Sequence, residues 1–124
     1  MSKSLGQIGE EIAANYLQRK KYKILERNYR RPWGELDIVA KKDNEVVFVE
    51  VKTITQSQEK SRFLPEEEIT PQKKKRLIRA AKMYLWEKKY PPDQTWQIDV
   101  IGIEQIGKRK YRLRHTKKAI SDYR

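Results

Sequence analysis

The stretch GELDIVAKKDNEVVFVEVKT, residues 34–53, decides the fold of this chain. Residues 35–41 and 45–53 are rich in Val, Ile, Leu and Phe, and the pair Asp43-Asn44 between them is typical of a tight turn. Two such runs on either side of a short turn predict a β-hairpin. The second strand is mainly apolar, so its charged residues call for an explanation.

Charged side chains interrupt one face of that second strand. Since side chains alternate between the faces of a strand, Glu50 and Lys52 share a face with Val46 and Phe48. A carboxylate on a core-like strand needs a counter-charge, a metal ion or an opening to water. A salt bridge within the sheet, with no catalytic role, is the alternative explanation for this pair.

The turn length predicts which residues face each other across the hairpin. If Asp43-Asn44 is a two-residue turn, Asp37 lies directly opposite Glu50 and Glu35 lies opposite Lys52, whereas a longer loop would shift this register. Directly opposite Cβ atoms are about 5 Å apart, so the two carboxylates would repel each other. A divalent cation that prefers oxygen ligands, Mg²⁺ or Mn²⁺, would neutralise them.

The remaining elements surround this hairpin. Apolar spacing predicts a helix over residues 5–17 with Ser4 as its N-cap. A short strand follows at 22–27, then an irregular segment at 28–33. After the hairpin we expect a loop at 54–68, a helix that begins at Thr70-Pro71, a strand at 95–103 and an edge strand at 108–116. The order αβββαβ with one more strand predicts a single α/β domain over residues 1–124, a mixed sheet flanked by helices.

Composition excludes several classes of protein. The 124 residues include no Cys and one His, His115, so disulfide scaffolds, iron–sulfur clusters, thiol catalysis and multi-histidine zinc sites are excluded. The chain has neither an apolar run of about 18 residues nor a secretory signal at its start, so we expect a cytoplasmic protein with no membrane span. His115 is expected on an edge strand or at the surface, and Asp99 as a structural acid.

Positive charge is concentrated in the second half of the chain. The formal net charge is +12, of which residues 1–50 contribute +2 and residues 51–124 contribute +10. Such an excess favours nucleic acid as the partner, although a solvated basic face is the alternative. Trp33 could stack on a base or lie in the core. The candidate phosphate-binding residues are Arg30, Arg31, Lys73, Lys74, Arg76 and Arg79.

The hairpin residues resemble the core motif of the PD-(D/E)XK nuclease superfamily. The closer resemblance is to the YraN family, bacterial proteins similar to archaeal Holliday-junction resolvases. It spans Gly6 to about Ile103, and Leu36 stands where the superfamily name has proline, as is usual in the YraN pattern. The supporting matches outside the hairpin are Gly6, Gly9, Glu10, Ala13, Tyr16, Leu17, Asn28, Lys73, Ala80, Tyr84, Leu85, Asp99 and Val100.

This resemblance implies a restriction-endonuclease-like fold and a set of roles. Asp37 and Glu50 would bind Mg²⁺ (or Mn²⁺), with the carbonyl of Val51 as a third ligand. Lys52 would orient or activate the attacking water. Glu10 would be an additional metal or water ligand; helical spacing alone does not choose between Glu10 and Glu11, and only the resemblance selects Glu10.

Two hypotheses of different classes follow. The first is a Mg²⁺-dependent endonuclease that hydrolyses phosphodiester bonds in branched or structured DNA. The second is a nucleic-acid-binding module that keeps the fold and the basic surface but does not cleave. An RNA substrate stays open as well, because phosphate contacts do not distinguish the two sugars. Resolution of a junction requires two symmetric cuts and therefore implies a homodimer.

Overall fold

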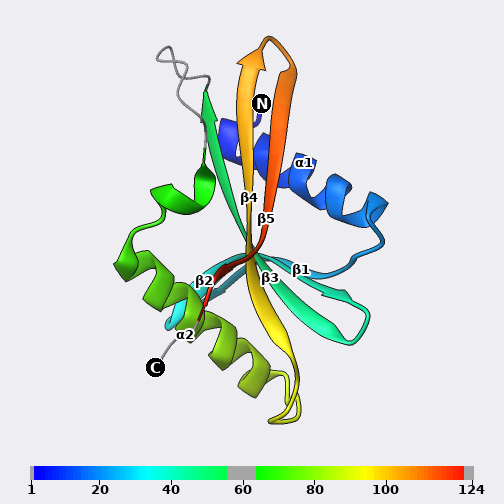
Figure 1. Cartoon of the computed structure of the whole chain (residues 1–124), viewed down its shortest axis with the longest axis vertical. Coiled ribbons are helices and arrows are strands. Elements are labelled where there is room, and N and C mark those ends of the chain that lie inside the picture. Colours follow the sequence, from blue (N-terminus) through cyan, green and yellow to red (C-terminus); the bar gives the residue numbers. More distant parts are fainter. Residues whose placement is uncertain (1, 56–63, 122–124) are drawn as a thin grey trace.

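The computed structural model of the chain describes residues 2–55 and 64–121, which form one five-stranded sheet between two helices (Figure 1). The strands lie in the order β1-β2-β3-β4-β5. All neighbouring pairs are antiparallel except β3 and β4, which are parallel. Their bounds are β1 Lys23–Arg31, β2 Gly34–Lys42, β3 Glu45–Thr55, β4 Trp96–Gly107 and β5 Lys110–Ile120.

The first helix, α1 (Leu5–Arg19), begins at a capping box. The backbone N–H of Gln7 donates to Ser4 Oγ over 3.2 Å, and Gln7 Oε1 accepts from the backbone N–H of Ser4 over 2.9 Å. These two bonds satisfy N–H groups that a helix start otherwise leaves without partners. Ser4 is therefore the N-cap, as predicted.

The second helix, α2 (Pro71–Glu87), makes the crossover that the parallel pair requires. Thr70 caps it by accepting from the backbone N–H of Lys73 over 3.1 Å, and Pro71 occupies its first turn. A short 3₁₀ helix, η1 (Pro65–Glu68), precedes it. Each α-helix covers one face of the sheet, α2 over the core around Phe48 and Tyr84 and α1 over the core around Leu17 and Ile101. The predicted mixed sheet flanked by helices, with an αβββαβ core, is confirmed.

The segment predicted as irregular, residues 28–33, is mainly strand, so that prediction was wrong. β1 continues to Arg31 because it pairs with β2 up to Arg31 and Gly34, and Pro32-Trp33 forms the turn between them. Gly34 has a φ of +154°, and a Cβ there would lie 2.9 Å from Ala80 Cβ of α2. Only glycine therefore starts β2 without strain at this contact.

Three other strands are longer or placed differently than predicted. β3 reaches Thr55 because parallel pairing with β4 continues there, opposite Gln105. β4 runs to Gly107, and β5 begins at Lys110 and extends to Ile120 along β4. Residues 56–63 of the predicted loop lie outside the described residues, and residues 65–68 form η1.

A buried polar cluster joins β4, β5 and α1. The Asp99 side chain is fully buried and bonds His115 Nε2 over 2.7 Å, while His115 Nδ1 lies 2.9 Å from the hydroxyl of Tyr16. The backbone N–H of Lys118 also donates to Asp99, over 3.0 Å. Asp99 is thus a structural acid, as predicted. His115 lies on the edge strand but is not a surface residue, because only 6% of its side chain is exposed.

None of the helices in the described part of the chain combines the length and the apolar character needed to cross a membrane.

The contact between α1 and β3 depends on Gly9. A Cβ at this position would lie 2.1 Å from Oγ1 of Thr53, so Gly9→Ala forces the two elements apart. We expect Gly9→Ala to lower the free energy of unfolding by roughly 1–3 kcal/mol, measured by urea denaturation. Thr53→Ala should restore part of the loss, because it removes the clashing hydroxyl.

Gly6→Ala is the matched control for this prediction. A Cβ there meets only Ser4 Oγ, at 3.9 Å, so this variant should be neutral or gain up to about 1 kcal/mol from helix propensity. Equal effects of the two substitutions would contradict a specific contact at Gly9.

Candidate active site

Next to the turn, the register of the β2–β3 hairpin agrees with the sequence prediction. Cα pairing runs from Lys42–Glu45 to Ile38–Val49. The pairing ends there, so the predicted direct pairs of Asp37 with Glu50 and of Glu35 with Lys52 do not form; Glu35 pairs with Arg30 of β1 instead. Beyond that point Asp37 contacts β3 through its side chain, because Asp37 Oδ2 accepts a hydrogen bond from the backbone N–H of Val51 over 2.9 Å.

The pleat of β2 is interrupted at Asp37. Leu36 and Val39 pack into the core beneath α2, whereas Ile38 packs into the core beneath α1, so strict alternation fails between Leu36 and Ile38. On β1, Asn28 occupies the matching position with a φ of +54°. A local irregularity of this kind re-aims a side chain. As a result, Asp37 bonds β3 through its carboxylate, and its backbone does not pair with β3.

Glu50 is a nearly buried acid that lies beside a second acid, Asp37. Only 14% of its side chain is exposed. Burial, followed by the negative charge of Asp37 and a hydrogen bond between the two carboxyl groups, raises the pKa of Glu50 to about 8. Lys73 Nζ, 3.7 Å from Glu50 Oε2, opposes this shift. At neutral pH Glu50 of the metal-free protein therefore carries a proton.

Glu10 lies at the edge of this pair. Burial raises its pKa, and the charge of Asp37 adds to the shift, while Arg27, Arg30 and a hydrogen bond from Asn28 lower it. Glu11 is instead exposed and paired with Lys3, 2.6 Å away. Of these two acids, which helical spacing alone did not separate, Glu10 is the one whose pKa responds to Asp37.

The arrangement fits a divalent cation, although it is not a closed cage. Among residues 2–55 and 64–121, no three His, Asp or Glu side chains lie close enough together to hold a metal by themselves. Asp37 and Glu50 instead offer two neighbouring carboxylates where the β2–β3 pairing ends, next to the backbone of Val51. Hard oxygen donors with buried negative charge suit Mg²⁺ or Mn²⁺, which keep several water ligands.

Lys52 follows Glu50 on the same face of β3. It is half-buried, and its parallel partner on β4 is Gly102, which has no side chain to cover it. The ammonium group can therefore extend toward a substrate bound at the carboxylates. The expected order of charges along β3, a carboxylate and then a cation two residues later, is retained on one face.

Two of the six predicted phosphate-binding residues lie beside the carboxylates. Lys73 contacts Glu50, and the exposed Arg30 is close enough to Glu10 to lower its pKa. Arg31 is held instead by Glu87, with hydrogen bonds of 3.2 and 3.0 Å, and lies over the ring of Tyr29. The other three are on α2: Lys74 and Arg79 line a separate groove, and Arg76 is exposed.

Arg27 was missed as a candidate. It pairs with Ile38 across the β1–β2 hairpin and influences Glu10, but the hairpin itself was not predicted, since residues 28–33 read as irregular. A two-residue turn at Pro32-Trp33 would have predicted the pairing of β1 with β2, which places Arg27 next to the strand that carries Asp37.

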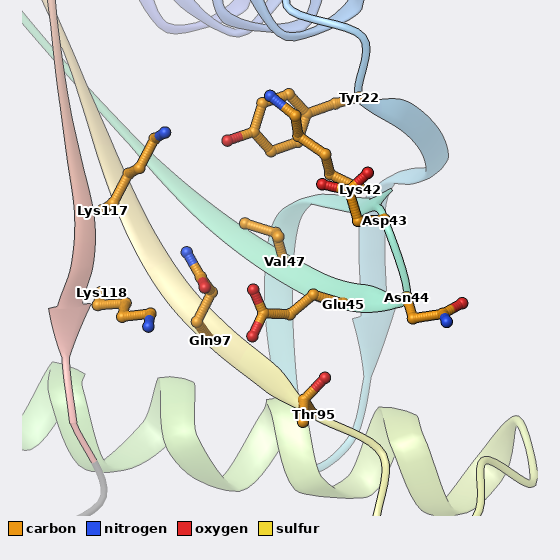
Figure 2. Close-up of a pocket in the computed structure, with 10 residues that line it drawn as sticks. All are labelled: Tyr22, Lys42, Asp43, Asn44, Glu45, Val47, Thr95, Gln97, Lys117 and Lys118. Carbon is orange, nitrogen blue, oxygen red and sulfur yellow. The ribbon is translucent and has the colours of Figure 1, made fainter.

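The pocket in Figure 2 is distant from the carboxylates. It has a volume of about 480 Å³ and lies at the β2–β3 turn, lined by Tyr22, Lys42, Val47 and Lys117 among others. Glu45 at its rim is five residues before Glu50, about 16 Å along a strand. Val47 also belongs to the α1 face. The candidate site is therefore an open surface of the sheet, not this pocket.

The raised pKa of Glu50 predicts a pH-dependent stability in EDTA. The folded protein holds a proton that the unfolded chain releases above its ordinary pKa of 4.5, so this stabilisation is complete below that pH and is lost as the pH rises through about 8. Glu50→Gln keeps a neutral group at every pH. The variant should exceed the wild type by about 1–3 kcal/mol at high pH and differ little in acid, measured by urea denaturation.

Glu11→Gln, which removes an exposed carboxylate, is the control for this measurement. A Glu50→Gln variant that is less stable than the wild type at high pH without metal would contradict the burial of two repelling carboxylates.

Comparison with known proteins agrees with the resemblance seen in the hairpin. Residues 9–103 match the family described as "Uncharacterised protein family UPF0102". The chain is similar to a UPF0102 protein of Syntrophomonas wolfei, 52% identical over 68% of this chain and 71% of that protein. It is also similar to those of Syntrophotalea carbinolica, 44% identical over 84% and 81%, and Alkaliphilus oremlandii, 37% identical over 96% and 99%. The chain therefore belongs to the UPF0102 family, the YraN family that its hairpin residues predicted.

Proposed function

We propose that this protein is a Mg²⁺- or Mn²⁺-dependent endonuclease that hydrolyses phosphodiester bonds in branched or structured DNA, in the cytoplasm. The observation that carries the proposal is the nearly buried Glu50 beside Asp37, whose carboxylate is held by the backbone of Val51, with Lys52 two residues after Glu50 on the same face of β3. The αβββαβ core, the family membership and the +10 charge of residues 51–124 support it.

The residues of the site divide the chemistry among them. A divalent cation, when bound, lowers the pKa of a water and offsets negative charge on the scissile phosphate. Asp37, Glu50 and the carbonyl of Val51 would hold it, with Glu10 as an outer ligand. Lys52 would orient the attacking water and stabilise the charge that grows on the phosphate oxygens. Arg30 and Lys73 would position the phosphate backbone.

One observation favours the alternative, a nucleic-acid-binding module without cleavage. Lys73 Nζ lies 3.7 Å from Glu50, so a protein cation already offsets part of the charge that a metal would neutralise. In a nuclease, Lys73 would move from Glu50 to the phosphate when the cation binds. In a module, it would remain as a fixed counter-charge.

Cleavage assays separate these two functions. Four-way-junction and duplex DNA are incubated with the protein, with and without Mg²⁺ or Mn²⁺. We expect metal-dependent cleavage of the junction, reduced at least about 100-fold in Asp37→Asn and Glu50→Gln, with most DNA binding retained in both. Glu45→Gln, on the same strand but at the hairpin turn, is the matched control.

Full cleavage by the Asp37→Asn and Glu50→Gln variants would overturn the site. Binding without cleavage of any substrate would instead support the module. Matched RNA structures added as competitors test whether DNA is the preferred substrate.

Junction resolution also predicts a homodimer, because two symmetric strands must be cut. Sedimentation of the protein at the concentration used for cleavage should give twice the mass of the 14.9 kDa chain. A strictly monomeric mass, free and with junction DNA, would contradict resolution in particular while leaving single-strand incision possible.

A further inference from the structure

The outer face of α2, opposite its buried stripe, carries a dense row of cations. We define this face by Lys74, Lys75, Ile78, Arg79, Lys82, Met83 and Trp86, which recur at helical spacing. The opposite stripe packs on the sheet through Leu77, Ala80, Ala81 and Tyr84. Lys75, Arg79 and Lys82 are exposed, and the side chains of Lys75 and Arg79 join no ion pair within the described residues.

A groove lies against this face, and Pro71 and Ser121 also line it. Its volume is about 630 Å³, and Ile78 and Met83 lie in it between the basic side chains. Trp86 stands one helical turn beyond Lys82 and is 73% exposed, the one large hydrophobic side chain in the described part of the chain that is so exposed. Cations beside an exposed aromatic ring are the combination that binds single-stranded or terminal nucleotides.

The concentration of positive charge on α2 lowers the stability of the helix when nothing is bound to it. Residues 73–82 include six Lys or Arg and no acid, and the one acid of α2, Glu87, bonds Tyr29 and Arg31. Cations in the first turns oppose the helix dipole, and like charges four residues apart, such as Lys75 and Arg79, repel. A bound polyanion would relieve both effects. Features that violate a local rule in this way are expected at functional surfaces.

The direction of α2 connects this face to the active site. Lys73, in the first turn, contacts Glu50, and the outer face begins at the next residue, Lys74. From Lys74 to Trp86 the helix advances about 18 Å, the length of about five base pairs of duplex DNA. Figure 1 shows α2 on the side of the sheet away from α1. A DNA strand at the carboxylates can thus continue along α2.

We propose that the outer face of α2 binds the sugar–phosphate backbone of a DNA arm that leaves the active site, and that Trp86 stacks on an unpaired or terminal base of that arm. This inference rests on the proposed function, which supplies the strand. It is preferred to docking on a lipid surface because a helix that lies in a membrane interface presents a continuous apolar stripe, whereas Ile78 and Met83 are half-buried between lysines.

DNA binding without cleavage tests the basic part of this face. Affinity is measured in EDTA over a range of salt concentrations, for four-way junctions with arms of about 15 or about 3 base pairs. On long arms, the double variant Lys75→Gln/Arg79→Gln should lower the salt slope by about 1.5–2 and weaken binding at least about 10-fold. On short arms it should bind like the wild type. Lys20→Gln/Lys108→Gln, which removes two exposed charges elsewhere, is the control.

Trp86 is tested in the same assay with one arm shortened to about five base pairs, the length that α2 spans, so that the terminal base of that arm lies beside Trp86. Trp86→Ala should weaken binding about 5- to 100-fold, and Trp86→Phe should restore most of it because a phenyl ring also stacks. Circular dichroism confirms that the helix is intact in each variant. A salt slope like that of the wild type, or an equal loss in the control, would overturn the proposal.

Two further outcomes are distinguishable. If Lys75→Gln/Arg79→Gln loses binding to phosphatidylserine vesicles but not to DNA, the face is a membrane surface and the proposal is wrong. If the arm-length dependence is found but no substrate is cleaved, the proposed nuclease activity fails and the α2 surface stands.

Discussion

The burial of the Glu50 carboxyl group beside that of Asp37 is the constraint around which this structure is arranged. Glu50 is nearly buried on a strand where valine and phenylalanine are the residues that precede it from 46 to 49, so its charge is costly without a partner. Asp37 adds to that cost instead of relieving it. An apolar residue at either position would be less costly for stability, and the proposed cation site would account for the pair.

The neighbouring elements hold this pair in place. The irregularity at Asp37 and Asn28 turns the Asp37 carboxylate to the N–H of Val51. The close approach of α1 at Gly9 brings Glu10 to the same region, where its pKa responds to Asp37. On the other face, the first turn of α2 delivers Lys73 to Glu50. Helices on both faces of the sheet thus converge on the end of one hairpin.

The sequence predicted the hairpin, its register and the order of elements because valine-rich alternation and turn residues are local signals. It did not predict that pairing would end at Ile38–Val49. There the Asp37 carboxylate accepts the N–H of Val51 in place of a backbone carbonyl, and such a contact depends on the folded sheet rather than on the local sequence. His115 is a second example. A lone histidine among lysines reads as a surface residue, and only the fold shows Asp99 and Tyr16 on either side of it. The sequence predicts Arg31 as a phosphate ligand, but in the fold Glu87 of α2 lies beside it and forms an ion pair with it.

The central claim, that Asp37 and Glu50 form a cation site, is tested most directly by the protons released when metal binds. Because the metal-free pair holds a proton at neutral pH, a cation must displace it. Calorimetric titration with Mn²⁺ at pH 7, in buffers of different ionisation enthalpy, should show about one proton released by the wild type and neither binding nor release by Asp37→Asn. Binding of Mn²⁺ without proton release, or equal binding by Asp37→Asn, would contradict the account.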